Sequence, residues 1–238
     1  MGAVMVVSSQ KQLKPVASRR TVQDQVYEQL RDALMSGAFE ARESFTIASL
    51  SERFQTSHMP VREALRRLAA ENALRIAASG TAFVPDLSQE ELDDISRARI
   101  IIECATAELA MPNLGKGDLG TLQALIEVHR ETGISGDIVA MAAANRQFHF
   151  HIYAAAQSPV LMSQIENLWL RSGPYVRFLS DRMATLLKTD YRSGFTLHHE
   201  RMLEALRRGD APAFVDAVRA DIAATRTLLH QFLGELSA

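Results

Sequence analysis

The segment Ser57–Leu68, with the sequence SHMPVREALRRL, decides the fold of the first part of this chain. Its apolar residues recur at i, i+3, i+4 and i+7, which is the pattern of an amphipathic helix. Ser57 is a residue type that caps helices, and Pro60 is tolerated in the first turn, where its N–H would lack an intrahelical partner. A neighbouring stripe that can face an anion consists of His58, Arg62 and Arg66. The segment therefore predicts a helix with one apolar face and one cationic face.

The flanking sequence completes a small unit, here called the head. Upstream, Ile47, Leu50 and Phe54 give a short helix its own apolar face, and two short helices that share a core match helix-turn-helix geometry. Downstream, two short runs around Ser79-Gly80-Thr81 predict a β-hairpin in the place of a wing. With an amphipathic helix over Val22–Leu34, we predict a winged helix-turn-helix of three helices plus a hairpin. The alternative is an ordinary helical hairpin with a solvated arginine face.

The segments Val26–Leu30 and Pro60–Leu68 resemble the N-terminal domain of GntR-family bacterial transcription regulators. The run PVREALRRL is quite specific to that family. The resemblance implies that Arg62 reads a guanine, that Ser57 contacts phosphate and that Gly80 lies at the wing tip near the minor groove. The DNA-contacting set that we predict from it is Ser57, His58, Met59, Arg62, Arg66 and Gly80.

The head departs from the family pattern in three places. The usual Pro-Gly after the first helix is Ala41-Arg42, and His58 stands where arginine is common at the start of the recognition helix. Met59 follows, where threonine is usual. We expect the fold to survive these changes, but the operator sequence need not be the family's common one.

Length and charge predict two parts. The chain has 238 residues, and its 47% of hydrophobic residues suffices for a real core. Residues 1–85 carry eleven Lys/Arg against eight Asp/Glu, whereas residues 86–238 carry 15 against 20. This asymmetry is expected when only the first part touches DNA. We therefore expect a flexible basic arm at 1–20, the head at 21–85 and a second domain at 86–238, with the hinge at Asp86-Leu87.

Cysteine usage and hydropathy favour a cytoplasmic protein. The single cysteine, Cys104, excludes an internal disulfide and suits a reducing compartment. No apolar run approaches the length of a membrane span, so we expect no membrane segment. Residues Met1–Ser9 lack the leading positive charge and the length expected of a signal peptide.

The pattern from Ser88 onward is helical almost throughout. Glycine and proline residues divide it into segments with short connections, which favour an all-α antiparallel bundle. We predict six helices, and the fourth contains Gly173-Pro174, where a kink is expected. The expected helices cover about residues 88–111, 118–131, 137–157, 158 to beyond 174, 191–208 and 212–236.

This bundle resembles the FCD effector domain that defines the FadR subfamily of GntR regulators. The likeness rests on the segments Arg99–Glu103, Asn145–His149 and His199–Leu206, followed by Gly209-Asp210. Many FCD domains hold a divalent metal in the bundle core through one Asp and three His. The corresponding positions in this chain are Asn145, His149, His199 and Asp221.

Two positions of this implied metal set differ from the family. Asn145 replaces an aspartate and is a weaker oxygen ligand, and Asp221 replaces the last histidine. The remaining two imidazoles and one carboxylate form a familiar facial set for a first-row transition metal with open positions. We therefore expect a divalent Zn, Ni, Fe or Mn ion, with open positions for water or an effector carboxylate.

Each residue of this set also has a plainer interpretation. The two histidines are equally explained as satisfied core residues, Asp221 as a solvated helix charge, and His198 competes with His199 for the same register. Arg99 occupies the position where the family often pairs an effector carboxylate, although it can instead pair with Glu103 one turn later. The effector-binding set that the resemblance implies is Arg99, Asn145, His149, His199 and Asp221.

These features predict a homodimeric, metabolite-responsive transcription regulator rather than an enzyme. A two-fold protein binds an inverted-repeat DNA operator, and a small organic acid or related anion in the bundle shifts the two heads. Repression relieved by the effector is the arrangement that the resemblance implies. Two alternatives stay open, namely a metal-dependent enzyme built on His149, His199 and Asp221, and a regulator whose pocket has lost its metal.

Overall fold

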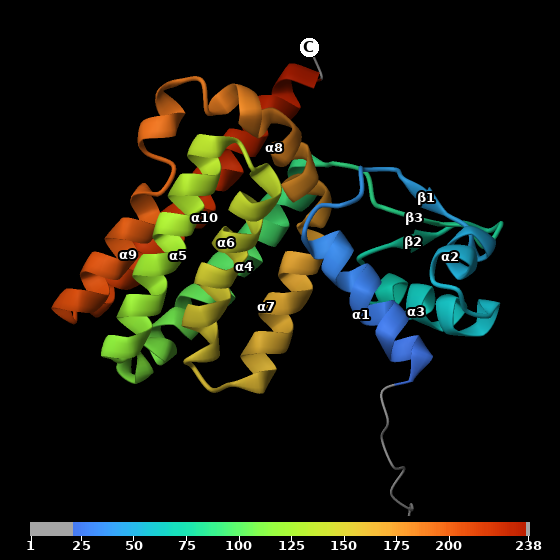
Figure 1. Cartoon of the computed structure of the whole chain (residues 1–238), viewed down its shortest axis with the longest axis horizontal. Coiled ribbons are helices and arrows are strands. Elements are labelled where there is room, and N and C mark those ends of the chain that lie inside the picture. The colour runs from blue at the N-terminus through green and yellow to red at the C-terminus, as the bar shows by residue number, and fades with distance from the viewer. Residues whose placement is uncertain (1–20, 237–238) are drawn as a thin grey trace, which may run out of the picture.

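The computed structural model describes residues 21–236, so the basic arm expected at 1–20 lies outside the described residues. The chain is mainly helical and forms the head followed by a helical bundle (Figure 1). The head contains α1 (Val22–Met35), β1 (Ser44–Phe45), α2 (Ile47–Arg53), α3 (His58–Ala70), β2 (Arg75–Ile76) and β3 (Ala82–Phe83). The bundle contains α4 (Gln89–Ala110), η1 (Met111–Asn113), α5 (Lys116–Ser135), α6 (Ile138–Ala154), α7 (Pro159–Arg171), α8 (Gly173–Leu186), η2 (Asp190–Ser193), α9 (Leu197–Arg208) and α10 (Ala211–Leu236). The predicted fold class is confirmed.

The core of the head lies between α1 and α3. The apolar faces that the sequence predicts for these helices face each other, and Leu30, Val61 and Leu68 are at most 3% exposed. Helix α1 begins with a capping box, in which the Thr21 hydroxyl accepts from the N–H of Asp24 and the Asp24 carboxylate accepts from the N–H of Thr21. This packing fixes the orientation of α3, which carries the predicted DNA contacts.

Three two-residue strands form an antiparallel sheet in the order β1-β3-β2. Strands β2 and β3 form the predicted hairpin, whose turn contains Gly80 with a φ of +83°, a conformation that favours glycine. The sequence does not predict β1, because two residues are too few to show the alternation of apolar and polar side chains. In the structure, β1 pairs with β3, and Phe45 lies opposite Ala82. Just before it, Arg42 has a φ of 66°, so this departure from the family's glycine costs about 1–2 kcal/mol of backbone strain.

The bundle differs from the prediction at the fourth expected helix, which is two helices. Helix α7 ends at Arg171 and α8 begins at Gly173, with Ser172 between them. Pro174 lies in the first turn of α8, where a missing N–H costs no hydrogen bond, whereas inside one long helix it would break the ladder. The described bundle therefore has seven α-helices in place of the six predicted.

The longest helix, α10, runs through the bundle and packs along both α4 and α9, while α5 packs along α6 (Figure 1). Helix α10 contacts both α4, the first helix of the bundle, and α9, the helix that precedes it. Side chains from distant segments of the sequence therefore meet around α10. Across residues 21–236, no helix is both long and apolar enough to cross a bilayer.

The C-terminal end of α1 docks on the junction between α7 and α8. A Cβ atom at Gly173 would come within 2.1 Å of the carbonyl oxygen of Leu34 in α1, so only glycine fits there. Nearby, Gly37 has a φ of +73°, and a Cβ atom on it would lie 2.8 Å from the backbone nitrogen of Arg177. Head and bundle are therefore in direct backbone contact.

Candidate functional site

A groove of about 570 Å³ lies in the head between α3 and the hairpin. Arg62 and Arg66 of α3 line one wall, and Gly80 belongs to the opposite wall. Both arginine side chains are exposed, and Arg66 also contacts Glu63 at 3.4 Å. A groove with guanidinium groups on a helix and a hairpin tip opposite is suited to following a nucleic-acid backbone and reaching base edges.

The start of α3 places the three other predicted DNA contacts, Ser57, His58 and Met59, on the surface. Ser57 occupies the N-cap position with an extended backbone, but its hydroxyl forms no capping hydrogen bond within the described residues. Ser57 therefore takes the N-cap position for which its residue type is suited, but its side chain does not cap the helix. Its hydroxyl and the N–H groups of the first turn can instead donate to a phosphate.

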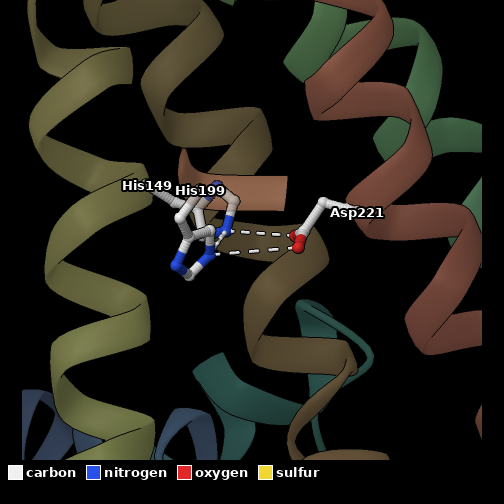
Figure 2. A group of neighbouring side chains, drawn as sticks. All are labelled: His149, His199 and Asp221. Carbon is white, nitrogen blue, oxygen red and sulfur yellow. Dashed lines mark hydrogen bonds and ion pairs between the residues drawn. The ribbon is translucent and has the colours of Figure 1, made fainter. Parts of the chain in front are cut away.

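A cavity of about 530 Å³ lies inside the bundle, and His149, His199 and Asp221 are among its lining residues. They come from α6, α9 and α10 and point toward one another (Figure 2). The Nε2 atom of His149 lies 3.2 Å from Oδ2 of Asp221 and 3.2 Å from Nε2 of His199, which is 3.9 Å from Oδ1 of Asp221. Ligand atoms around one transition metal lie about 3 Å apart, so this spacing fits a metal ion.

Burial sets the charges of this cluster. It lowers the pKa of His199 to about 3, so the ring is neutral at physiological pH and keeps a free lone pair. Burial alone would raise the pKa of Asp221, but the hydrogen bond with His149 and the surrounding imidazoles hold it below its usual range. The cluster therefore combines the neutral His199 ring with one ionised carboxylate.

Three other polar residues were candidates for this cluster, and none of them belongs to its converging set. Asn145, one turn before His149 on α6, lines the same cavity. His198 also lines it, but it is not one of the three converging residues, and its Nδ1 atom is buried with no hydrogen-bond partner in the described part of the chain. His151 turns away, and its Nε2 atom lies 2.9 Å from Oδ1 of Asp118.

Arg99 lines the cavity and also makes the alternative contact that the sequence allowed. Its Nε donates to Oε1 of Glu103 at 2.6 Å, and its Nη2 lies 3.4 Å from Oε2. Glu103 is fully buried and also accepts from the Tyr153 hydroxyl at 2.6 Å and from Nε1 of Trp169 at 3.1 Å. The buried carboxylate is thus fully used by protein donors, while part of the guanidinium stays available to a ligand.

Tyr153 links this network to the cluster. Burial raises the pKa of the Tyr153 hydroxyl well above its usual range, so it stays protonated and donates to Glu103. Its oxygen lies 3.3 Å from Nδ1 of His149 and can accept the proton of that nitrogen. In this tautomer the Nε2 lone pair of His149 faces His199 and Asp221, as metal ligation requires, whereas in the other tautomer Nε2–H donates to Asp221. Sequence spacing singles out Glu103 only as a partner of Arg99 and does not reveal Tyr153.

Family models identify both parts of the chain. Residues 22–84 match the family described as bacterial regulatory proteins, gntR family, and residues 94–224 match the FCD domain. The chain belongs to the GntR family. Its FCD domain places this GntR-family protein among the FadR-like regulators, which confirms the resemblance drawn from the sequence.

The relatives that resemble this GntR-family protein include named transcription regulators. The HTH-type transcriptional regulator McbR of Escherichia coli K12 is 36% identical over 155 residues, which cover 65% of this chain and 70% of McbR. The solved structure of E. coli McbR/YncC has a TM-score of 0.82 at 30% identity and covers 90% of this chain and 99% of that chain. The gluconate operon transcriptional repressor of Bacillus subtilis is 23% identical over 193 residues, covering 80% of this chain and 77% of the repressor.

These comparisons decide the class of protein. The relatives and the matching folds are transcription regulators, so the chain is a regulator and not an enzyme. The prediction of a non-enzymatic protein is confirmed, and the alternative of a metal-dependent enzyme built on His149, His199 and Asp221 is wrong.

Proposed function

We propose that this GntR-family protein is a homodimeric, metabolite-responsive repressor that binds an inverted-repeat operator in the cytoplasm. The observation that carries the proposal is the presence in one chain of an exposed cationic groove in the head and, in the bundle, a cavity lined by a buried His-His-Asp cluster. The relative named as a repressor of a gluconate operon supports repression as the mode of action. In this proposal the cavity binds the effector, and the groove binds the operator DNA.

In the proposed complex, α3 enters the major groove and Arg62 donates two hydrogen bonds to O6 and N7 of a guanine. Ser57 and the N–H groups at the start of α3 contact phosphate, and Gly80 carries the wing tip toward the minor groove. His58 and Met59 adjust the operator sequence, because a neutral imidazole offers one donor and one acceptor and a thioether offers apolar contact.

The cavity is proposed to hold one divalent transition metal, Zn, Ni, Fe or Mn. His149, His199 and Asp221 are its ligands, and Asn145 offers a weaker fourth oxygen from the same helix as His149. The neutral His199 ring and the ionised carboxylate described above are the protonation states that ligation requires. When bound, the metal supplies open coordination positions to which an effector carboxylate can attach.

A small organic acid or related anion is the proposed effector. The cavity has about 530 Å³, within the range of about 300–1,000 Å³ that is typical of small-molecule sites. Arg99 keeps N–H donors beyond the two that Glu103 accepts, and such donors recognise a carboxylate. The proposed effector-binding residues are Arg99, Asn145, His149, His199 and Asp221.

Helix α8 is the proposed path from the cavity to the head. Ser172 and Val176 line the cavity, while Gly173 between them contacts the Leu34 carbonyl of α1. On the adjacent helix α7, Glu166 pairs with Arg31 of α1 at 2.8 Å. A ligand that displaces the first turn of α8 therefore displaces α1 as well and repositions the head.

The outer face of α4 supports the homodimer. Ile101 and Leu109 are 65% and 57% exposed, and they lie on one stripe with Ala98 and Ala105. An apolar stripe of this kind marks an interaction surface, and a stripe of one helix can pair with its own copy across a two-fold axis. Two heads related by that axis would require an inverted repeat.

Operator selection from random duplexes tests this function. We expect enriched sequences with two-fold symmetry, a dimer by sedimentation, about one metal ion per chain by elemental analysis, and release of DNA on adding one of a panel of small carboxylates. Enrichment of sequences without two-fold symmetry would contradict the proposal. Protein that cannot be loaded with metal but still releases DNA with a carboxylate would establish the other alternative, a regulator whose pocket has lost its metal.

A further inference from the structure

His129 on α5 lies against the cluster, although nothing in its spacing connects it with the other histidines. Its side chain is buried, with 5% exposure, and its Nδ1 atom lies 3.2 Å from Nδ1 of His199. This contact is on the opposite edge of the His199 ring from Nε2, which faces His149 and Asp221. His129 therefore contacts His199 on the side away from His149 and Asp221, and it is not one of the three converging residues.

The chemistry of imidazole gives this contact a direction. A neutral ring has one N–H donor and one lone pair, so His199 can ligate through Nε2 only if Nδ1 carries the proton. A buried N–H needs an acceptor, and the Nδ1 lone pair of His129 lies at the required distance. A neutral His129 ring that carries its own proton on Nε2 leaves its Nδ1 lone pair free to accept.

The position of His129 is itself fixed by its neighbours. The ring of Phe195 meets the His129 ring edge to face, with centroids 5.2 Å apart and planes at 82°. Phe195 reaches this position because residue 133 is glycine, and a Cβ atom there would lie 2.5 Å from its Cζ atom. The acceptor is therefore held in place rather than free to rotate.

His149 has an equivalent arrangement on its own far edge. Its Nδ1 atom lies 3.3 Å from the Tyr153 hydroxyl, which donates to Glu103 and so can accept from the ring. Both candidate ligand rings therefore carry a buried acceptor opposite the nitrogen that faces Asp221. Partners of this kind hold a ligating histidine in the correct tautomer and orientation.

We infer that His129 is a positioning residue for the metal site, which accepts the Nδ1 proton of His199 and so directs the Nε2 lone pair toward the metal. This inference rests on the metal site proposed above. It assigns a role to a third histidine, which lies outside the set Asn145, His149, His199 and Asp221. It also implies that His199 and His129 share a single proton between their Nδ1 atoms.

The test compares two substitutions of His129 by metal titration. His129→Phe keeps an aromatic ring against Phe195 but removes the acceptor, whereas His129→Gln keeps a side-chain acceptor without a ring. Zn²⁺ affinity is measured by competition with a chromophoric chelator, and Co²⁺ spectra report the ligand field. We expect His129→Phe to bind Zn²⁺ about 10–100-fold more weakly, the usual effect of removing such a partner. His129→Gln should recover most of the affinity.

Thermal unfolding of the metal-free variants separates positioning from folding. If His129 only supports the fold, both variants lower the melting temperature of metal-free protein and leave Zn²⁺ affinity unchanged, which overturns the inference. Equal weakening of Zn²⁺ binding in the Phe and Gln variants would also overturn it, because the acceptor would then not matter.

His149→Ala serves as the control for the metal site itself. Wild-type protein that binds Zn²⁺ no better than His149→Ala would refute the metal site, and the role of His129 with it. Wild-type protein that binds Zn²⁺ tightly, with His149→Ala defective and His129→Phe unaffected, would refute only the role of His129.

Discussion

The DNA-facing groove of the head and the cavity of the bundle differ in how their side chains are held. Arg62 and His58 are exposed on a single helix, whereas His149 and His199 are at most 2% exposed and have hydrogen-bond partners from other helices. Removing an exposed side chain leaves few groups unpaired, but removing a buried partner leaves others without one. Substitutions in the head should therefore change binding alone, and substitutions in the cavity should change stability as well.

The largest effect is expected at Glu103, the fully buried carboxylate beneath the cavity. Glu103→Leu leaves the guanidinium of Arg99 and the donors of Tyr153 and Trp169 without their acceptor. We expect unfolding to become easier by about 3–5 kcal/mol, measured by urea denaturation. Glu108→Ala, an exposed change on the same helix, should stay within about 0.5 kcal/mol of wild type. Equal free energies of unfolding for the two variants would contradict the expectation that buried sites are more sensitive to substitution than exposed ones.

Gly173 tests the contact that joins the two regions. In Gly173→Ala the new methyl group meets the Leu34 carbonyl, and we expect a loss of about 1–3 kcal/mol of stability together with altered operator affinity. Gly120→Ala is the matched control, since its Cβ atom meets open space within α5 and should add about 0.5–1 kcal/mol. Urea denaturation and fluorescence anisotropy measure the two properties. Wild-type operator affinity in a destabilised Gly173→Ala would show that this contact supports the fold without signalling.

Arg62→Ala should separate binding from stability in the head. The side chain is exposed, so the melting temperature and dimer should be unchanged, while discrimination between operator and random duplex falls by about 1–3 kcal/mol. Anisotropy titrations with both duplexes give this difference directly. A variant that weakens both duplexes equally would assign Arg62 to phosphate rather than to a base.

The pH dependence of stability should come from the cavity rather than from the groove. Burial depresses the pKa of His129 to about 4 and that of His199 to about 3, below the value of about 6.5 in the unfolded chain. Below about pH 6.5 the unfolded state therefore binds more protons than the folded state. The stability that is present above this pH is lost progressively as the pH falls toward the pKa values of the folded state. Each histidine contributes at most about 1.4 kcal/mol per pH unit.

Metal-free protein in a chelator shows this dependence most directly. Urea denaturation between pH 7 and pH 5 should give decreasing stability, and His129→Phe should reduce the slope because one of the titrating rings is gone. A slope that is the same in the variant would place the titration elsewhere in the chain.

The head can be predicted from sequence because its signals are local. Val61, Leu65 and Leu68 repeat along one helical segment, and Gly80 marks the turn of the hairpin that follows shortly after it in the sequence. Ser57 shows the limit of this reasoning, since a residue type suited to capping occupies the N-cap without forming the bond. Residue preference gives a position, but the rotamer depends on contacts that the pattern does not contain.

The cavity depends on contacts between distant segments. The positions of His149, His199 and Asp221 follow from the family resemblance, and no periodicity relates them to one another. His129 joins them only because α5 packs beside α9, and the break at Ser172 is coupled to a contact with α1. Such features arise from packing, so they are visible only in three dimensions.

The contact between Gly173 and Leu34 also limits how freely the parts of this protein can be exchanged. A hybrid that joins this bundle to the head of another regulator would retain Gly173 but receive a different first helix. The end of that helix would have to bring a bare carbonyl to the same place, and the residue corresponding to Gly37 would have to tolerate a positive φ beside Arg177. Head exchange should therefore succeed when these few backbone positions match, whatever the identity of the DNA-reading side chains.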